Sequence, residues 1–236
     1  MVSCVYNGAT LKEKEMTFNE LILAWESIPP KEIQQLASVL HDNTTLVLLN
    51  LYSNQIDDKG AQYLAHALQD NMTLTTLRLQ SNCIDSKGAK YILQSLEHNI
   101  TLTTLDIAQN EIGDQGVQQV AQTLQINKTL DILNLQFNAI GNKGTKYLAQ
   151  ALQKNATLTT LDYGSNKIDI NGIQHLTQAL NNNTALNNFT LRSTDIDASG
   201  AQCLAETLTI LNLESANIRS VGAQYLAQGL QNNKVK

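Results

Sequence analysis

The hydrophobic and polar positions of this chain recur with a fixed period of 28 residues. The stretch from Leu130 to Ile140 reads L-x-x-L-x-L-x-x-N-x-I, and the same pattern begins again at other leucines. These are Leu46, Leu74, Leu102, Leu158 and Leu186. A constant period of this size is typical of a solenoid, in which each unit buries its apolar face against the next unit.

Each repeat predicts a short strand followed by a helix. Within the strand, leucines alternate with other residues, so the leucines point inward and the intervening residues point outward. We expect parallel strands at about residues 48–52, 76–80, 104–108, 132–136 and 160–164. The helix follows as an apolar stripe at helical spacing, and good N-cap residues mark its start. They are Asp58, Ser86, Asp114, Asn142 and Ser220, with Asp169 and Asp197 as caps one residue earlier in their own repeats.

Three further columns of equivalent positions are expected to hold neighbouring repeats together. The first contains asparagines, whose carboxamides can both donate to and accept from buried backbone groups of adjacent turns. The second contains glycines in the first helical turn, which indicate close approach of a neighbouring backbone. The third is largely aromatic and is expected to pack between helices. The columns are Asn54, Asn82, Asn110, Asn138 and Asn166; Gly60, Gly88, Gly116, Gly144, Gly172, Gly200 and Gly222; and Tyr63, Tyr91, Gln119, Tyr147, His175, Cys203 and Tyr225.

The repeats extend over residues 18–236, which we interpret as a single domain. Residues 18–45 form a degenerate first repeat, in which apolar residues keep the leucine positions. Residues 1–17 do not fit the pattern. Because the end of a solenoid would otherwise expose its core, we expect them to form an N-terminal cap or to be partly disordered.

The repeats become irregular from residue 186 onward. Phe189 replaces a core leucine, and Thr194 and Ala216 replace the asparagine that follows the strand. Six residues are missing before the last repeat, because Gly222 follows Gly60 by 162 positions instead of 168. We therefore expect a shortened helix or a tight turn near residues 205–210.

The L-x-x-L-x-L-x-x-N pattern followed by a helix resembles leucine-rich repeats of the ribonuclease-inhibitor-like class. The resemblance implies a right-handed α/β solenoid, a horseshoe with short parallel strands on its concave face and helices on its convex face. It also implies a non-enzymatic module that binds a folded protein through the concave face, with inhibition or modulation of that protein as an expected consequence.

Two other resemblances carry alternatives. The C-terminal repeats of NOD-like receptors look similar, and the alternative function is a ligand-sensing or autoinhibitory region of such a receptor. Met1 and the non-repeat residues 1–17 look like a natural start and argue against this alternative. The many Asn, Gln and Thr residues resemble leucine-rich repeat effectors that bacteria such as Legionella inject into host cells. That resemblance implies a host protein or another effector as partner.

Composition narrows the partners and the compartment. The net charge of −5 and the pI near 5.3 argue against nucleic acid, which requires clustered Lys and Arg. No apolar run is long enough to span a membrane, and residues 1–17 lack the apolar core of a signal peptide. Cys4, Cys83 and Cys203 are too few and too scattered for a disulfide framework. We expect a monomer in a reducing compartment, which means the cytoplasm, or the host cytosol for an injected effector.

Six Asn-x-Thr sequences match the acceptor motif for N-glycosylation. They begin at Asn43, Asn71, Asn99, Asn127, Asn155 and Asn188. The first five occupy one repeat column just after the helix. We expect them to end the helix in a left-handed conformation instead of carrying a glycan.

The outward strand positions differ from repeat to repeat, whereas the inward columns do not. Variation on a constant frame suits recognition of an irregular partner, and aromatic and arginine side chains supply most interface energy. The predicted partner-binding residues are Trp25, Tyr52, Arg78, Asp106, Gln136, Phe137, Asp162, Arg192 and Glu214.

Catalytic chemistry finds little support in the sequence. His41, His66, His98 and His175 fall in different columns without a metal-ligand neighbour at short spacing. Asp106 and Asp162 share a column two repeats apart, roughly 10 Å by strand spacing, which is wide for the carboxylate pair of a retaining glycosidase and near the upper limit for an inverting one. Nothing else in these columns supports a sugar site. We predict no catalytic residue, no metal and no cofactor.

Overall fold

One parallel sheet runs through all the repeats of the computed structural model. The model describes residues 18–194, 196, 198–207, 210–216 and 218–232. The strands are β1 (Glu20–Ile22), β2 (Leu48–Asn50), β3 (Thr76–Arg78), β4 (Thr104–Asp106), β5 (Ile132–Asn134), β6 (Thr160–Asp162), β7 (Asn188–Thr190) and β8 (Ile210–Asn212). They pair in the order in which they follow along the chain. The predicted cap, residues 1–17, lies outside the described residues.

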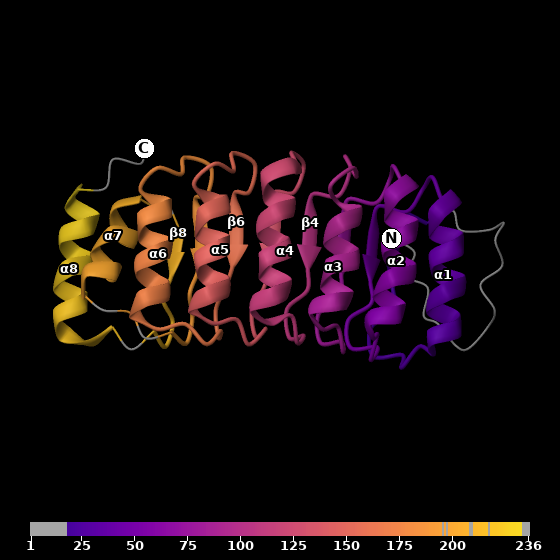
Figure 1. Cartoon of the computed structure of the whole chain (residues 1–236), viewed down its shortest axis with the longest axis horizontal. Coiled ribbons are helices and arrows are strands. Elements are labelled where there is room, and N and C mark those ends of the chain that lie inside the picture. Colours follow the sequence, from indigo (N-terminus) through magenta and orange to yellow (C-terminus); the bar gives the residue numbers. More distant parts are fainter. Residues whose placement is uncertain (1–17, 195, 197, 208–209, 217, 233–236) are drawn as a thin grey trace.

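A helix follows each strand, and the helices lie in a row over one face of the sheet (Figure 1). They are α1 (Pro30–Asp42), α2 (Asp58–Asp70), α3 (Ser86–Ser95), α4 (Gly113–Ile126), α5 (Asn142–Leu152), α6 (Ile170–Leu180), α7 (Ala198–Thr207) and α8 (Arg219–Asn232). The predicted α/β solenoid is therefore confirmed. None of these helices is long and apolar enough to cross a membrane.

The strands are shorter than the sequence predicts. β2 ends at Asn50 instead of residue 52, although hydrogen bonds to the next repeat continue from the Leu51 and Ser53 amides. The chain leaves the strand because Ser53 adopts a left-handed backbone with φ of 56°. Equivalent residues do the same in every repeat, which ends each strand at the same point.

Among the described residues the core is aliphatic except for two fully buried aromatic side chains, Tyr163 and Phe189. Leu49, Leu77 and their equivalents up to β7 are fully buried, and each buried leucine stabilises the fold by roughly 1.5–3 kcal/mol. Leu211 of β8 is only partly buried. Tyr163 takes a leucine position and is also fully buried. Its hydroxyl lies 3.1 Å from Thr145 Oγ1, and Thr145 in turn donates to the Gly141 carbonyl at 2.8 Å. Burial raises the pKa of the Tyr163 phenol.

The asparagine ladder predicted after the strands is present. Asn82 Nδ2 donates to the carbonyl of Leu51 in the preceding repeat at 3.1 Å and to Leu79 at 2.9 Å. Its Oδ1 accepts from the amides of Asn54 and Ile56, also in the preceding repeat, at 3.0 and 2.9 Å. One side chain thus satisfies buried backbone groups of two turns.

Four asparagines of the glycosylation motifs form a second ladder, and the left-handed conformation predicted for their column is wrong; they are Asn71, Asn99, Asn127 and Asn155. Asn71 is extended, with φ of −72° and ψ of 125°. Its Nδ2 donates to Leu40 of the preceding repeat at 2.8 Å, and its Oδ1 accepts from the Leu74 amide at 2.8 Å. The Asn71 side chain is buried and hydrogen-bonds to the preceding repeat and to its own connection. Asn71 therefore ends the helix with an extended backbone and a side chain that links repeats.

The predicted N-cap column is shifted by one residue. The caps are Asp57, Asp85 and, as one alternative predicted, Asp169. Asp58, Asp114 and Asn142 lie within the first turn and accept from amides of the next repeat instead. Asp114 Oδ1 accepts from the amides of Gly141 and Gly144 at 2.7 and 3.0 Å.

This bond between repeats accounts for part of the glycine column, and an isoleucine four residues earlier, as at Gly60 and Gly116, accounts for the rest. A Cβ at Gly144 would lie 2.6 Å from Asp114 Oδ1 and 2.8 Å from Ile140 Cγ2. The close approach is real, but it comes first from a neighbouring carboxylate and an isoleucine of the same repeat. The third column packs as predicted, because Tyr63, Tyr91 and Tyr147 are partly buried against the core.

The shortened connection near residues 205–210 is also present. α7 ends at Thr207 and β8 begins at Ile210, whereas five residues separate α2 from β3. Residues 208–209 themselves lie outside the described part of the chain. β8 nevertheless pairs with β7 in register, with Leu211 opposite Phe189.

Candidate functional site

The open face of the sheet, opposite the helices, carries the outward side chains of the strands. The predicted columns lie here, and the structure adds one that the prediction missed. It is the first position of each strand: Glu20, Leu48, Thr76, Thr104, Ile132, Thr160, Asn188 and Ile210. Strand alternation was the available signal, because this position points to the same side as the position two residues later. Ile132 is 38% exposed on this face.

A groove of about 470 Å³ crosses the open face from β2 to β6. Of the predicted partner-binding residues, four line it. They are Tyr52, Arg78, Asp106 and Asp162. Thr104, Ile132 and Asn134 complete its middle. The other five predicted residues, Trp25, Gln136, Phe137, Arg192 and Glu214, are not among the residues that line the groove.

Two exposed aromatic residues lie on one column at the edge of the open face. Trp25 is 68% exposed and Phe137 is 48% exposed. Both have left-handed backbones, with φ of 66° and 54°. Most members of this column are serines, whereas a bulky residue at positive φ is an outlier that costs of order 1–3 kcal/mol. Trp25 and Phe137 are therefore penalised by strain and by exposure together.

Trp25 does not stand alone. Its ring meets the Tyr52 ring edge-on, with centroids 4.8 Å apart and an interplanar angle of 84°. Four strand steps separate β1 from β5, so Trp25 and Phe137 lie roughly 19 Å apart at about 4.8 Å for each step.

The two groove carboxylates are fixed in place by their own backbone. Oδ1 of Asp106 accepts from the Ala108 amide at 3.1 Å, and Oδ1 of Asp162 accepts from the Gly164 amide at 3.2 Å. Burial raises the pKa of both carboxyl groups, and these amide bonds oppose that rise. The charge of Arg78 also lowers the pKa of Asp106, while the charge of Asp162 raises it.

Three of the predicted residues bind one another at the C-terminal end of the face. Arg192 lies 3.7 Å from Asp162 and 3.5 Å from Glu214. Gly164 allows the backbone of Arg192, in the next repeat, to pack closely against it. A Cβ at Gly164 would lie 3.1 Å from both the Arg192 amide nitrogen and the Arg192 carbonyl oxygen. These partly exposed pairs contribute at most about 1 kcal/mol each.

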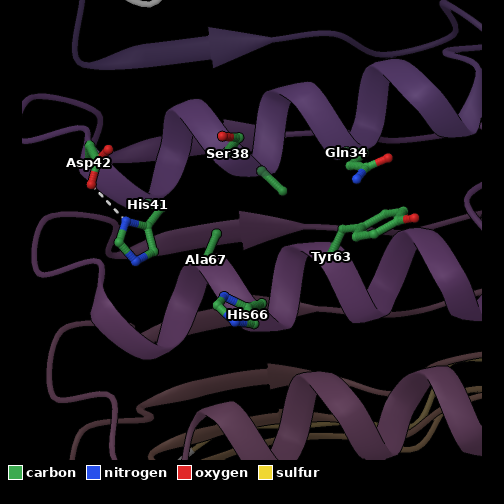
Figure 2. Close-up of a pocket in the computed structure, with 8 residues that line it drawn as sticks. Gln34, Ser38, His41, Asp42, Tyr63, His66 and Ala67 are labelled. Carbon is green, nitrogen blue, oxygen red and sulfur yellow. Dashed lines mark hydrogen bonds and ion pairs between the residues drawn. The ribbon is translucent and has the colours of Figure 1, made fainter.

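A second hollow, of about 340 Å³, lies between α1 and α2 on the helical side (Figure 2). His41 contacts Asp42 through Nδ1 at 2.7 Å and Asp70 through Nε2 at 3.2 Å. The hydrogen bond to Asp42 is the main cause of the raised pKa of His41. The His66 ring lies 6.4 Å from the His41 ring, so histidines of different columns meet here.

This helical hollow offers no evident chemistry. Among the described residues, no group of three His, Cys, Asp or Glu side chains could hold a metal ion. The contacts of His41 instead link α1 to the end of α2. We therefore place the candidate site on the open face of the sheet.

Comparison with known proteins agrees with this architecture. A family model described as Leucine Rich repeat matches residues 42–65, 70–93, 98–121, 127–149 and 206–227. These are leucine-rich repeats. A search of curated proteins finds none whose sequence matches the chain.

Solved structures of other leucine-rich repeat folds are similar. Actin-binding site 2 of leiomodin-1 matches with a TM-score of 0.51 and 20% identity over 71% of this chain and 87% of that chain. The tropomodulin C-terminal domain of Caenorhabditis elegans matches with a TM-score of 0.52 and 16% identity over 61% and 87%. Identities this low show a shared fold alone. The resemblances to the ribonuclease-inhibitor-like class, to NOD-like receptors and to bacterial effectors stay predictions.

Proposed function

We propose that this leucine-rich repeat chain is a non-enzymatic module that binds a folded protein through the open face of its sheet. The observation that carries this proposal is the pair of strained, exposed aromatic residues Trp25 and Phe137. The left-handed backbone ends the strand in every repeat, but a bulky exposed side chain is not needed there, because serine occupies most equivalent positions. Large aromatic side chains on a surface are the residues that most often dominate a protein interface.

The size of the face favours a macromolecular partner. Trp25 and Phe137 lie roughly 19 Å apart by strand spacing, and the groove crosses much of the space between them. A small ligand in the groove would not reach both aromatic residues. A protein surface would contact both, together with the Tyr52 ring that supports Trp25.

An enzymatic role is the weaker interpretation of the same face. The carboxylates that line the groove belong to Asp106 and Asp162, and the strand register places Asn134 between them. Two strand steps separate them by roughly 10 Å, and neither contacts a nucleophile in the described residues. Their arrangement suits recognition of charge better than acid–base catalysis.

Actin is the first partner to test. The leiomodin-1 domain is an actin-binding site, and it shares this fold at 20% identity. Because such a likeness carries no partner by itself, actin serves as one defined probe beside proteins captured from a lysate and then purified.

The decisive experiment replaces both aromatic residues by the residue that the column prefers. Trp25→Ser and Phe137→Ser remove the interface side chains and put the residue that the column prefers on the left-handed backbone, so circular dichroism and thermal stability should be retained. We expect each change to weaken binding of a purified partner by about 30-fold, which corresponds to roughly 2 kcal/mol.

Ser165→Ala, in the same column, is the matched control and should leave the affinity within about twofold. Unchanged affinity of the Trp25→Ser/Phe137→Ser double variant would remove the open face as the binding surface.

A further inference from the structure

We propose that the middle of the groove is a slot for an arginine side chain of the partner, whose guanidinium group lies between Asp106 and Asp162 and over Asn134. The slot deepens the proposed function, because it states which chemistry the open face recognises. It rests on that proposed function only for the identification of the arginine as part of a protein.

The strand register builds the slot. Asp106 on β4 lies beside Asn134 on β5, and Asn134 lies beside Asp162 on β6. The two carboxylates therefore flank a neutral carboxamide across two strand steps. Oδ1 of each carboxylate accepts from the amide two residues ahead. The Asn134 side chain also hydrogen-bonds to Asp106, and Arg192 lies 3.7 Å from Oδ2 of Asp162, so a partner's cation would share these carboxylates with groups of the chain itself.

The floor of the slot suits the aliphatic stem of a long cationic side chain. Ile132 precedes Asn134 by two residues, lines the groove and is 38% exposed. Equivalent positions in the neighbouring strands carry Thr104 and Thr160. Arginine and lysine commonly lay their methylene groups on such apolar surface while the charged head finds polar partners.

The charges of the slot are incompletely balanced within the chain. The ion pairs of the described residues do not include Asp106, and Asp162 has Arg192 only at 3.7 Å. Arg192 is shared with Glu214. Burial raises the pKa of both aspartates, and the charges of Arg78 beside Asp106 and of Arg192 beside Asp162 oppose that rise without cancelling it. A cation from the partner would replace the favourable interaction with water that these carboxylates lose on burial.

A guanidinium group fits this arrangement better than a metal ion. Metal ligands must converge within about 2.0–2.6 Å of one ion, and carboxylates on strands two steps apart do not converge in that way. A guanidinium group presents five N–H donors in a planar fork and can donate to carboxylates on two sides at once. The Asn134 carboxamide oxygen accepts from the Gln136 amide at 3.1 Å, and its second lone pair can accept from the same guanidinium group.

The test uses a small probe that enters the slot without reaching the distant aromatic residues. The probe is the peptide acetyl-Gly-Arg-Gly-amide, and the matched control is the same peptide with citrulline, which keeps the shape and removes the charge. Binding is followed by the carbon-13 signals of the Asp106 and Asp162 carboxyl groups.

We expect saturable shifts at millimolar arginine peptide, and at least tenfold weaker binding of the citrulline peptide. Asp106→Asn/Asp162→Asn should weaken binding of the arginine peptide at least tenfold, as read from backbone amide shifts. Asp42→Asn, on the helical side, should have no effect. Equal binding of the citrulline peptide, or unchanged binding by the double aspartate variant, would overturn the slot. Equal binding of a lysine peptide would overturn the assignment of a guanidinium group.

The outcome separates the slot from the proposed function. Trp25→Ser/Phe137→Ser should leave peptide binding unchanged, because the tripeptide does not reach Trp25. If the unmodified chain does not bind the arginine peptide, but the aromatic double variant no longer binds the protein partner, the slot is rejected and the proposed function is kept. The reverse pattern keeps the slot and rejects the open face as a protein-binding surface.

Discussion

The repeats of residues 46–185 and those after residue 186 build the same parallel sheet, but different contacts hold them together. In the first region, asparagines bridge from one turn to the preceding one, as Asn82 does to Leu51 at 3.1 Å. In the second region, Thr194 occupies the ladder position and donates to Leu191 of its own repeat at 2.6 Å. Ala216, in the last repeat, has no side-chain donor or acceptor at all.

The six missing residues remove the second ladder from the last repeat. In regular repeats this ladder occupies the connection from helix to strand, where Asn155 donates to Leu124 of the preceding repeat at 2.8 Å. Between α7 and β8 only residues 208–209 remain, too few for the asparagine turn. β8 still pairs in register with β7. Strand register therefore does not depend on either ladder, because backbone groups alone maintain it.

Coverage of the core also differs between the two regions. Leu152 and Leu230 occupy the same helix column, yet Leu152 is fully buried and Leu230 is 66% exposed. Each repeat of a solenoid is stabilised chiefly by its neighbours, so the C-terminal repeat should be the first to open. The contrast shows that a leucine at a core position contributes to stability only where a neighbouring repeat covers it.

The largest expected effect tests this coverage directly. Leu152→Ala should lower the free energy of unfolding by about 2–5 kcal/mol, because it leaves a cavity in a packed core. Leu230→Ala should change it by less than about 0.5 kcal/mol, since the side chain is largely exposed. Urea denaturation followed by circular dichroism compares the two, and equal losses would contradict the difference in coverage.

The next effect concerns the first ladder. Asn110→Ala would leave the Leu79 carbonyl and the Ile84 amide without the side chain that bonds them at 3.0 Å each. The Leu79 carbonyl keeps its bond from Asn82 at 2.9 Å, so the Ile84 amide is the group left unsatisfied, and we expect a loss of about 1–3 kcal/mol. Thr194→Ala is the matched control and should cost about 1 kcal/mol, the usual net worth of one hydrogen bond. An unchanged melting temperature for Asn110→Ala would show that the ladder does not stabilise the fold.

A smaller gain is expected from repairing the ladder in the C-terminal region. Thr194→Asn gives the turn after β7 a carboxamide that can donate to the preceding repeat and accept from it, as Asn166 does. We expect a stabilisation of about 1 kcal/mol, seen as a higher urea midpoint. A destabilised variant would mean that the irregular repeats have settled into a geometry that excludes the asparagine.

The smallest expected effect concerns the charged groove of the regular repeats. Burial raises the pKa of Asp106, so protonation favours the folded state, and this contribution is lost as the pH rises through the raised pKa. At pH 7 the carboxylate is therefore destabilising, and Asp106→Asn should raise the melting temperature slightly.

The melting temperatures of Asp106→Asn and the unmodified chain should approach each other as the pH falls below the ordinary aspartate pKa of about 3.9. Thermal melts at several pH values provide the measurement. If Asp106→Asn is less stable than the unmodified chain at pH 7, the Asp106 carboxylate stabilises the fold, and the expected effect of its burial is wrong.

Much of the candidate site could be predicted from the period of the sequence. Strand alternation identified the outward columns, and Tyr52, Arg78, Asp106 and Asp162 do line one groove. The first strand position was missed, although Ile132 is part of the groove. The pairing of Arg192 with Asp162 and Glu214 could not be predicted, because it depends on side-chain reach between repeats instead of on column membership.

The sequence by itself determined the strand–helix order, the pairing of neighbouring strands and the buried leucines, because a fixed period of 28 residues stacks like residues on one another. Only the tertiary structure decided what the polar residues of each column do. Asp114 was expected to cap its own helix and instead bonds the amides of the next repeat, and Asn71 was expected to be left-handed and is extended. The physical reason is that hydrophobic burial depends on periodicity, whereas a hydrogen bond depends on distances of a few tenths of an ångström between repeats.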